Sequence, residues 1–294
     1  MIHKICYLSS EIMPFASTYS LGGFSRKITS IYHEDEEIDI RLLMPKYGFI
    51  SERKYILREV IRLKDIPLTF NEEDQMGSLK SAFIPETRVQ VYFVENDGYF
   101  RELPELVYKA RNGRPFKDND ERFCYFSFVA LKTLSQLFWV PDFIFCNDWQ
   151  TALVPKLLED IYTDEFYANI KPVFFLHSVN DMRMYSSKAL KMAGLNSTSS
   201  VDGTKLAIEH SALTVLMDDD KNTVLSLREI GEGKVSLKII EDSAINKLRN
   251  ITSEPKDTED LEIDQEDDFD KIYKGEISKS GAAILPSKRV RRMP

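Results

Sequence analysis

The sequence predicts an α/β protein built on a single Rossmann-like, doubly wound and mainly parallel sheet. Short apolar runs, typical of strands buried on both faces, alternate with segments whose apolar residues recur at helical spacing. Polar residues suited to chemistry stand directly after several of these runs. Hydrophobic residues make up 43% of the 294 residues, which is enough for a sizeable core.

The N-terminal half alternates strands with little helix. We expect strands at 5–8 and 38–44, separated by a helix over roughly 24–33. Further apolar runs at 60–63, 79–84 and 89–94 follow one another closely and predict an antiparallel extension or insertion. Glycines and prolines punctuate residues 95–118, which predicts a long loop of the kind that often serves function.

The second part of the chain has the clearer helix–strand alternation. A helix capped by Asn119 or Asp120 should run to about residue 138. Apolar runs at 143–146, 173–176 and 213–217 predict strands, and helical spacing predicts helices over 153–161 and near 203–211. Another helix is expected from residue 218 onward.

Composition divides the chain into three parts. Residues 1–230 form the predicted domain, and 231–253 are an uncertain helix or strand extension. Residues 254–274 hold ten acidic residues against three lysines, and 275–294 hold five basic residues and one acid. Such charged segments cannot bury enough apolar surface to fold, so 254–294 is expected to be a disordered tail.

Several function classes are disfavoured at this stage. No apolar run is long enough to span a membrane, and the N-terminus resembles neither a signal nor a transit peptide. The net charge of −8 argues against nonspecific nucleic-acid binding. Cys6, Cys124 and Cys146 make no CxxC pair, which favours buried, reduced thiols and a cytoplasmic location. No histidine pair has metal-ligand spacing, and we expect neither metal nor cofactor.

Ligands of such sheets bind beyond the carboxyl ends of the strands, which selects residues 9–11, 147–149, 177–178 and the Gly22–Gly23 turn. The carboxylate of Asp148 and the ring of Trp149 suit a sugar, although Asp148 can instead cap a helix and Trp149 belong to the core. A neutral His177 can donate a hydrogen bond to a substrate hydroxyl, or be an ordinary core histidine.

The glycine turn and the acidic run have alternatives too. Gly22 and Gly23 can bring backbone N–H groups to a phosphate or form an ordinary turn. The acidic residues at 118–121 lack the spacing of a calcium loop and favour a helix cap.

Taken together, five segments resemble the ADP-glucose type of bacterial glycogen synthases and plant starch synthases, over residues 1 to about 230. They occur in the order expected of that family and include the segment that carries its active-site histidine. The segments are 7–16 (YLSSEIMPFA), 42–48 (LLMPKYG), 118–123 (DNDERF), 146–155 (CNDWQTALVP) and 173–177 (VFFLH).

The resemblance implies a GT-B fold, with two Rossmann-like domains, and an enzyme that needs no metal. Glucose would pass from ADP-glucose to the 4-OH end of an α-1,4-glucan with retention of configuration. The N-terminal domain would shape the acceptor side, and the C-terminal domain would bind the nucleotide sugar.

The resemblance also implies a set of site residues. His177 would contact the transferred glucose, and Asp148 would lie near the acceptor. The further matching positions in or near the cleft are Glu11, Tyr99, Asn119 and Trp149.

The donor loop departs from the family pattern. Where the family has Lys-Thr-Gly-Gly-Leu-Gly-Asp, residues 17–23 read Ser-Thr-Tyr-Ser-Leu-Gly-Gly. Ser17 therefore replaces the donor-side lysine, Tyr19 and Ser20 replace two glycines, and Gly23 replaces an aspartate. Ser178 stands where the family usually has Asn.

Nothing after residue 230 resembles the second Rossmann domain. One hypothesis is therefore a glucosyltransferase domain that works with a separate C-terminal-half chain or keeps weak activity. A second is a glucan-binding module without transfer. A third is a scaffold or regulator that recruits partners through its charged tail.

Overall fold

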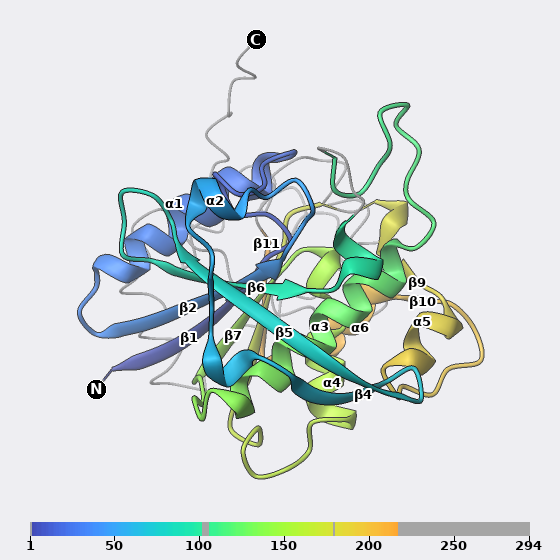
Figure 1. Ribbon diagram of the computed structural model, residues 1–294. Coiled ribbons are helices and arrows are strands. Elements are labelled where there is room, and N and C mark those ends of the chain that lie inside the picture. Colours follow the sequence, from blue (N-terminus) through green and yellow to red (C-terminus); the bar gives the residue numbers. More distant parts are fainter. Residues whose placement is uncertain (1, 102–105, 179, 217–294) are drawn as a thin grey trace, which may run out of the picture.

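The structure is a computed structural model that describes residues 2–101, 106–178 and 180–216 (Figure 1). The strands of its large sheet are β1 (His3–Leu8), β2 (Ile38–Pro45), β3 (Arg58–Glu59), β4 (Ile66–Phe70), β5 (Glu73–Phe83), β6 (Gln90–Glu95), β7 (Phe143–Asn147), β8 (Lys171–Leu176) and β11 (Leu213–Leu216). A separate two-stranded ribbon joins β9 (Met184–Tyr185) and β10 (Val201–Asp202).

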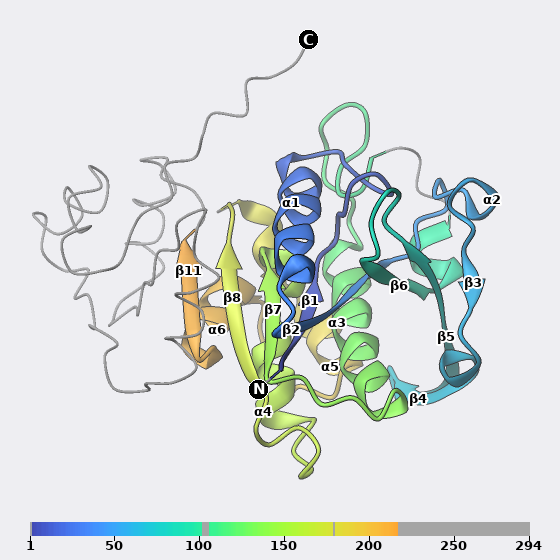
Figure 2. The same ribbon diagram turned by 90° about the vertical axis from the view of Figure 1, so that its left-hand side faces the viewer.

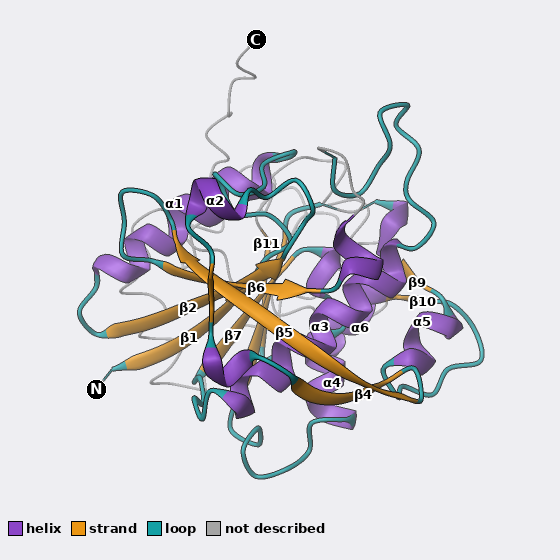
Figure 3. Cartoon of the chain, viewed as in Figure 1, coloured by secondary structure: helices purple, strands orange, loops and turns teal. Residues whose placement is uncertain are grey.

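The helices are α1 (Ser20–Glu34), α2 (Glu52–Tyr55), α3 (Asn119–Gln136), α4 (Val154–Asp160), α5 (Ser187–Met192) and α6 (Gly203–His210). Short turns complete the described chain: the 3-10 turns η1 (Ile61–Leu63), η3 (Trp149–Thr151) and η4 (Asp181–Arg183), and the π-helical turn η2 (Asp97–Arg101). Figure 3 shows how helices and strands alternate along the fold.

The large sheet confirms the predicted mainly parallel α/β class. Its order is β11–β8–β7–β1–β2–β6–β5–β3, with β4 paired to β5. Every neighbouring pair from β11 to β6 is parallel. The predicted antiparallel pairing is confirmed for the runs at 79–84 and 89–94, because β5 and β6 pair antiparallel. On its other side β6 pairs in parallel with β2 and so joins the parallel body. The short strands β3 and β4 add further antiparallel pairs to β5.

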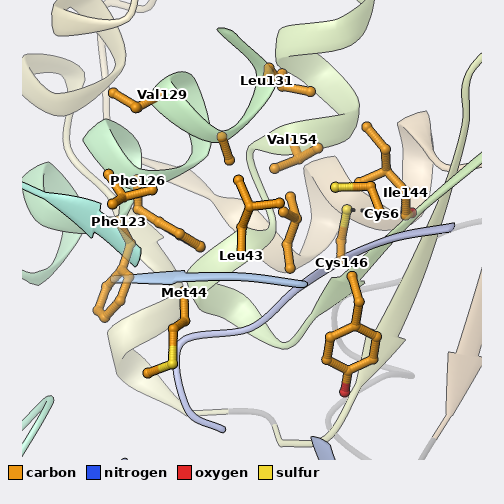
Figure 4. Packing of buried hydrophobic residues seen from close by; sticks show 14 of the residues in the cluster. Cys6, Leu43, Met44, Phe123, Phe126, Val129, Leu131, Ile144, Cys146 and Val154 are labelled. Carbon is orange, nitrogen blue, oxygen red and sulfur yellow. Dashed lines mark hydrogen bonds between the residues drawn. The ribbon is translucent and has the colours of Figure 1, made fainter. Parts of the chain in front are cut away.

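Helices cover both faces of this sheet. Figure 2 shows α1 on one side of the strands and α3 and α4 on the other. The core lies between these layers, where apolar side chains of β1, β2 and β7 meet those of α3 and α4 (Figure 4). Cys6, Cys124 and Cys146 are buried free thiols, as expected.

Several sequence expectations were wrong in detail. The run at 60–63 is largely the turn η1, in which the side chain of Ile61 is 92% exposed. Strand β4 and helix α5 had no counterpart in the sequence prediction. Helix α1 begins at Ser20 instead of residue 24, and α3 follows Asp118 with no side-chain cap from Asn119 or Asp120.

The strand order reverses between β1 and β7. The chain runs from β1 to β2 on one side, and β7 then returns to the other side of β1. In open α/β sheets such a switch point is where ligands bind, at the carboxyl ends of the strands. The segments after β1, β7 and β8 therefore form the candidate site.

Two further expectations concern the rest of the chain. Among the described residues, no helix has the length and apolar character to cross a membrane. The expected helix from residue 218, the extension at 231–253 and the charged tail at 254–294 lie outside the described residues.

Candidate functional site

The buried side chain of Asn147 joins three strand ends. Its Nδ2 donates to the carbonyl of Leu8, at 2.9 Å, which leaves Oδ1 to accept hydrogen bonds. Oδ1 lies 3.2 Å from the hydroxyl of Tyr7 and 3.2 Å from Nε2 of His177. Because an amide oxygen cannot donate, Nε2 of His177 must carry the proton in this contact. One amide thus links β1, β7 and the residue after β8.

His177 is held as a neutral imidazole. Burial lowers its pKa to about 3, so the ring carries no charge at pH 7. Phe24 of α1 packs edge-on against the ring, with 4.8 Å between centroids. With Nε2 donating to Asn147, Nδ1 has a free lone pair and no hydrogen-bond partner among the described residues. The sequence led us to expect a donor, whereas this geometry makes the side chain an acceptor for a ligand hydroxyl.

Asp148 has a strained backbone at the end of β7. Its φ of 60° and ψ of −176° are an arrangement that side-chain-bearing residues rarely adopt, at a cost of roughly 1–3 kcal/mol. Its carboxylate accepts hydrogen bonds from the backbone N–H of Ser178, at 3.1 Å, and from the hydroxyl, at 2.8 Å. The side chain therefore clamps β7 to the segment after β8, and it does not cap the following turn η3.

Burial also changes the ionisation of Asp148. Desolvation raises the pKa of its carboxyl to about 6, although the hydrogen bonds from Ser178, Trp149 and His177 favour the charged form and oppose the shift. A carboxyl whose pKa lies near neutrality beside a neutral imidazole is a feature common at functional sites.

Glu11 organises the loop that leads into α1. The residue is fully buried, and its carboxylate accepts hydrogen bonds from the Thr18 hydroxyl, at 2.9 Å, and the Tyr19 N–H, at 3.1 Å, as well as the Thr18 N–H. Burial raises the pKa of this carboxyl. Two backbone donors of the degenerate glycine loop, those of Thr18 and Tyr19, are thus bonded to an internal carboxylate.

Tyr108 is the central residue of this region that the sequence analysis missed. Its hydroxyl lies 2.6 Å from Oγ of Ser10 and also hydrogen-bonds Glu11. Its ring stacks on Tyr19 and meets the edge of Trp149. Tyr108 lies in the 95–118 segment, whose length was the sole signal in the sequence.

Trp149 and Asn119 lie around Tyr108 but are occupied by the protein itself. Trp149 is 1% exposed and packs between Tyr108 and Phe123, which is the core alternative for this residue. Asn119 donates from Nδ2 to the Tyr108 carbonyl, and its Oδ1 accepts from Arg122. Both side chains are thus internal supports of the region around Tyr108.

Tyr99 lies in a different cluster from the other candidates. Its ring packs against Tyr125 and Phe100, and burial raises its pKa to about 12. No described ring contact or hydrogen bond joins it to Tyr108, Asn147 or His177. The structure thus brings together Glu11, Asn119, Asp148, Trp149 and His177, and places Tyr99 apart.

The two glycines of the loop have different surroundings. A Cβ on Gly22 would stand 2.6 Å from the Ala16 carbonyl oxygen, whereas one on Gly23 would meet nothing within 4 Å. Gly22 therefore permits close packing of α1 on the preceding loop. Gly23 has no such steric role.

This set of groups suits an uncharged polyhydroxylated ligand. It combines a neutral imidazole acceptor with carboxylates already bonded to the protein. In the described part of the chain, no group of three or more His, Cys, Asp or Glu side chains is arranged to hold a metal ion.

Comparison with known proteins identifies relatives of this domain. Residues 4–218 match the sequence family described as the starch synthase catalytic domain. A glycogen synthase of Chlorobium luteolum is 37% identical over 177 residues, which are 60% of this chain and 36% of that protein. One from Pelodictyon phaeoclathratiforme is 34% identical over 189 residues, 64% of this chain and 38% of that protein. The chain thus spans well under half the length of these relatives.

A solved structure supports the fold. The catalytic domain of starch synthase IV from Arabidopsis thaliana, bound to ADP and acarbose, superposes with a TM-score of 0.66 at 20% identity. The match covers 78% of this chain and 49% of that one. At this identity the likeness shows the shared architecture alone.

The first prediction separates the two glycines. Gly22→Ala should destabilise the protein by about 1–3 kcal/mol, because the new methyl group meets backbone atoms that cannot move aside. Gly23→Ala, its matched control, should be neutral or stabilise by about 0.5–1 kcal/mol through helix propensity. Urea unfolding measures both values. Equal effects of the two substitutions would contradict the assigned steric role.

The second prediction concerns the tautomer of His177. In 15N spectra of histidine-labelled protein, His177 should stay neutral from pH 8 to about pH 5, with Nε2 protonated. Asn147→Asp should raise its pKa, because a carboxylate beside Nε2 favours the imidazolium. Tyr7→Phe removes a neighbouring hydroxyl without adding charge and serves as the control. Titration of wild-type His177 near 6.5 would refute this assignment.

The third prediction follows from Asp148. The folded carboxyl has a pKa of about 6, against 3.8 for a free aspartate, so the folded state binds this proton more tightly. Through this group, stability should rise as the pH falls from 7 to 4, by at most about 3 kcal/mol. Asp148→Asn lacks this contribution. Unfolding free energies of both proteins across that range test it, and a constant difference between them would argue against the shift.

Proposed function

The chain belongs to the starch synthase catalytic domain family, and on that premise we propose that its domain is the acceptor side of a GT-B glucosyltransferase. The proposed reaction transfers glucose from ADP-glucose to the non-reducing 4-OH of an α-1,4-glucan. One observation supports it most. The family-like residues Glu11, Asn147, Asp148 and His177 come together at the switch point of the sheet.

Among these residues, His177 has the role that its contacts define best. Its neutral ring offers the lone pair of Nδ1 to a hydroxyl of the transferred glucose, while Asn147 holds the opposite edge. A fixed, uncharged acceptor orients a sugar without any change of protonation during the reaction. Asp148 acts by keeping the segment after β8 against β7.

The diphosphate of the donor needs cationic groups from elsewhere. Ser17 stands where the family has its donor-side lysine, and the N–H groups of Thr18 and Tyr19 in the same loop already donate to Glu11. A donor-binding half, on the same polypeptide or on a separate chain, would supply those contacts. Losing charge-assisted hydrogen bonds of about 1.5–3 kcal/mol each would make transfer by residues 1–230 alone weak.

A second candidate function is α-glucan binding without transfer, or regulation through such binding. The altered donor loop favours it, since that loop differs from the family while Asp148, Trp149 and His177, after β7 and β8, match it.

The three buried free thiols support a reducing compartment, and we propose that the protein is cytoplasmic.

The fourth prediction tests both functions. In native gels cast with glycogen, the wild-type chain should be retarded. His177→Ala should weaken that retardation, whereas His33→Ala, on the exposed end of α1, should leave it unchanged. Incorporation of labelled glucose from ADP-glucose, with and without a donor-binding polypeptide of the family, separates transfer from binding. Both functions would be excluded if the wild-type protein were not retarded by glycogen and incorporated no glucose with or without the donor-binding polypeptide.

A further inference from the structure

We propose that the loop at residues 17–23 is a sugar-stacking subsite for an α-glucan. The ring of Tyr19 forms the stacking surface, and the carboxylate of Glu11 holds the loop by accepting hydrogen bonds from the backbone N–H groups of Thr18 and Tyr19. The inference rests on the proposed glucan-binding function and assigns it a residue that the family resemblance does not, since Tyr19 stands where the family has glycine.

The carboxylate of Glu11 holds the backbone of the loop. The N–H groups of Thr18 and Tyr19 both donate to this carboxylate, which is fully buried. A ligand would reach these two N–H groups only by displacing an internal carboxylate.

The ring of Tyr19 is partly exposed. The residue is 42% exposed, although one face of its ring is covered by Tyr108. The two rings stack with 5.2 Å between centroids and 20° between planes. The accessible surface therefore belongs to the outer face and edge of the Tyr19 ring. A flat, electron-rich face of this kind is where the C–H groups of a pyranose ring pack.

The ring of Tyr19 is held rigidly by its neighbours. The backbone of Tyr19 is fixed by Glu11, and the hydroxyl of Tyr108 is bonded to Ser10. The other side of Tyr108 meets Trp149. A ring held in this way loses little conformational entropy when a ligand binds, which strengthens stacking relative to a mobile surface tyrosine.

Tyr19 and the candidate site at His177 both lie next to the same helix, α1. Tyr19 immediately precedes α1, and Phe24 of the same helix packs on His177. Five residues span about 7.5 Å along a helix axis. A glucan whose end group reaches His177 can thus extend along α1 toward Tyr19. An α-1,4-glucan offers hydroxyls to the neutral imidazole and a pyranose face to the exposed ring.

Calorimetry with maltoheptaose on the full chain tests the stacking. Tyr19→Ala should weaken its binding roughly fivefold or more, whereas Tyr19→Phe keeps the ring and should stay within about twofold of wild type. Phe83→Ala is the matched control. Phe83 is also an exposed aromatic residue, at 57%. It pairs with Gln90 at the amino end of β6, whereas the candidate site lies at the carboxyl ends of the parallel strands.

The outcomes distinguish this inference from the proposed function. Wild-type protein that does not bind maltoheptaose would overturn the proposed function and this subsite with it. Wild-type protein that binds, with Tyr19→Ala equally tight, would overturn the subsite alone. Should Tyr19→Ala fold poorly, 13C-labelled tyrosine in the wild type replaces it: the Tyr19 ring signal, assigned through Tyr19→Phe, should shift on adding maltoheptaose, and an unmoved signal refutes the stacking.

Discussion

The buried amide of Asn147 is the constraint on which the rest of the site depends. It bonds Leu8 on one strand and His177 after another, and an unpaired polar group at this depth would cost about 1–3 kcal/mol. The ends of β1, β7 and β8 must therefore stay in register for all its bonds to form. That register fixes the tautomer of His177 and brings Ser178 to the carboxylate of Asp148. The neutral imidazole is thus a consequence of how three strands end.

The strained backbone of Asp148 is maintained by the same arrangement. Its N–H donates to the carbonyl of Phe175, its own carbonyl accepts from Thr151, and its carboxylate accepts from Ser178. These bonds compensate for the unfavourable φ and for burial of the carboxyl. Because Asp148 is bonded in these three ways, it fixes the segment after β8 against the end of β7. The backbone strain thus lies where the ends of β7 and β8 meet.

The sequence was sufficient for the sheet and for part of the site. Strands such as 143–147 are apolar on both faces, and the carboxyl-end rule then placed Glu11, Asp148 and His177 at one edge. It was insufficient wherever tertiary contacts decide. Nothing local marks Tyr108 as the hub, and nothing local indicates that Trp149 is buried against it. The predicted strand at 60–63 is wrong because this segment forms a turn in which Ile61 faces solvent. The apolar pattern of the sequence does not distinguish such a turn from a strand.

The charges at this edge support the proposal that it binds a sugar. The imidazole of His177 is neutral, and Glu11 and Asp148 are bonded to the protein. The nearby guanidinium of Arg122 is buried and engaged by Asn119, the Val107 carbonyl and Asp118. No cation of this set points at the loop before α1. Sugar hydroxyls need only a neutral acceptor and an aromatic face, and both are present here. The electrostatics of this edge therefore support the proposed division, in which this domain binds the glucan and another surface binds the donor diphosphate.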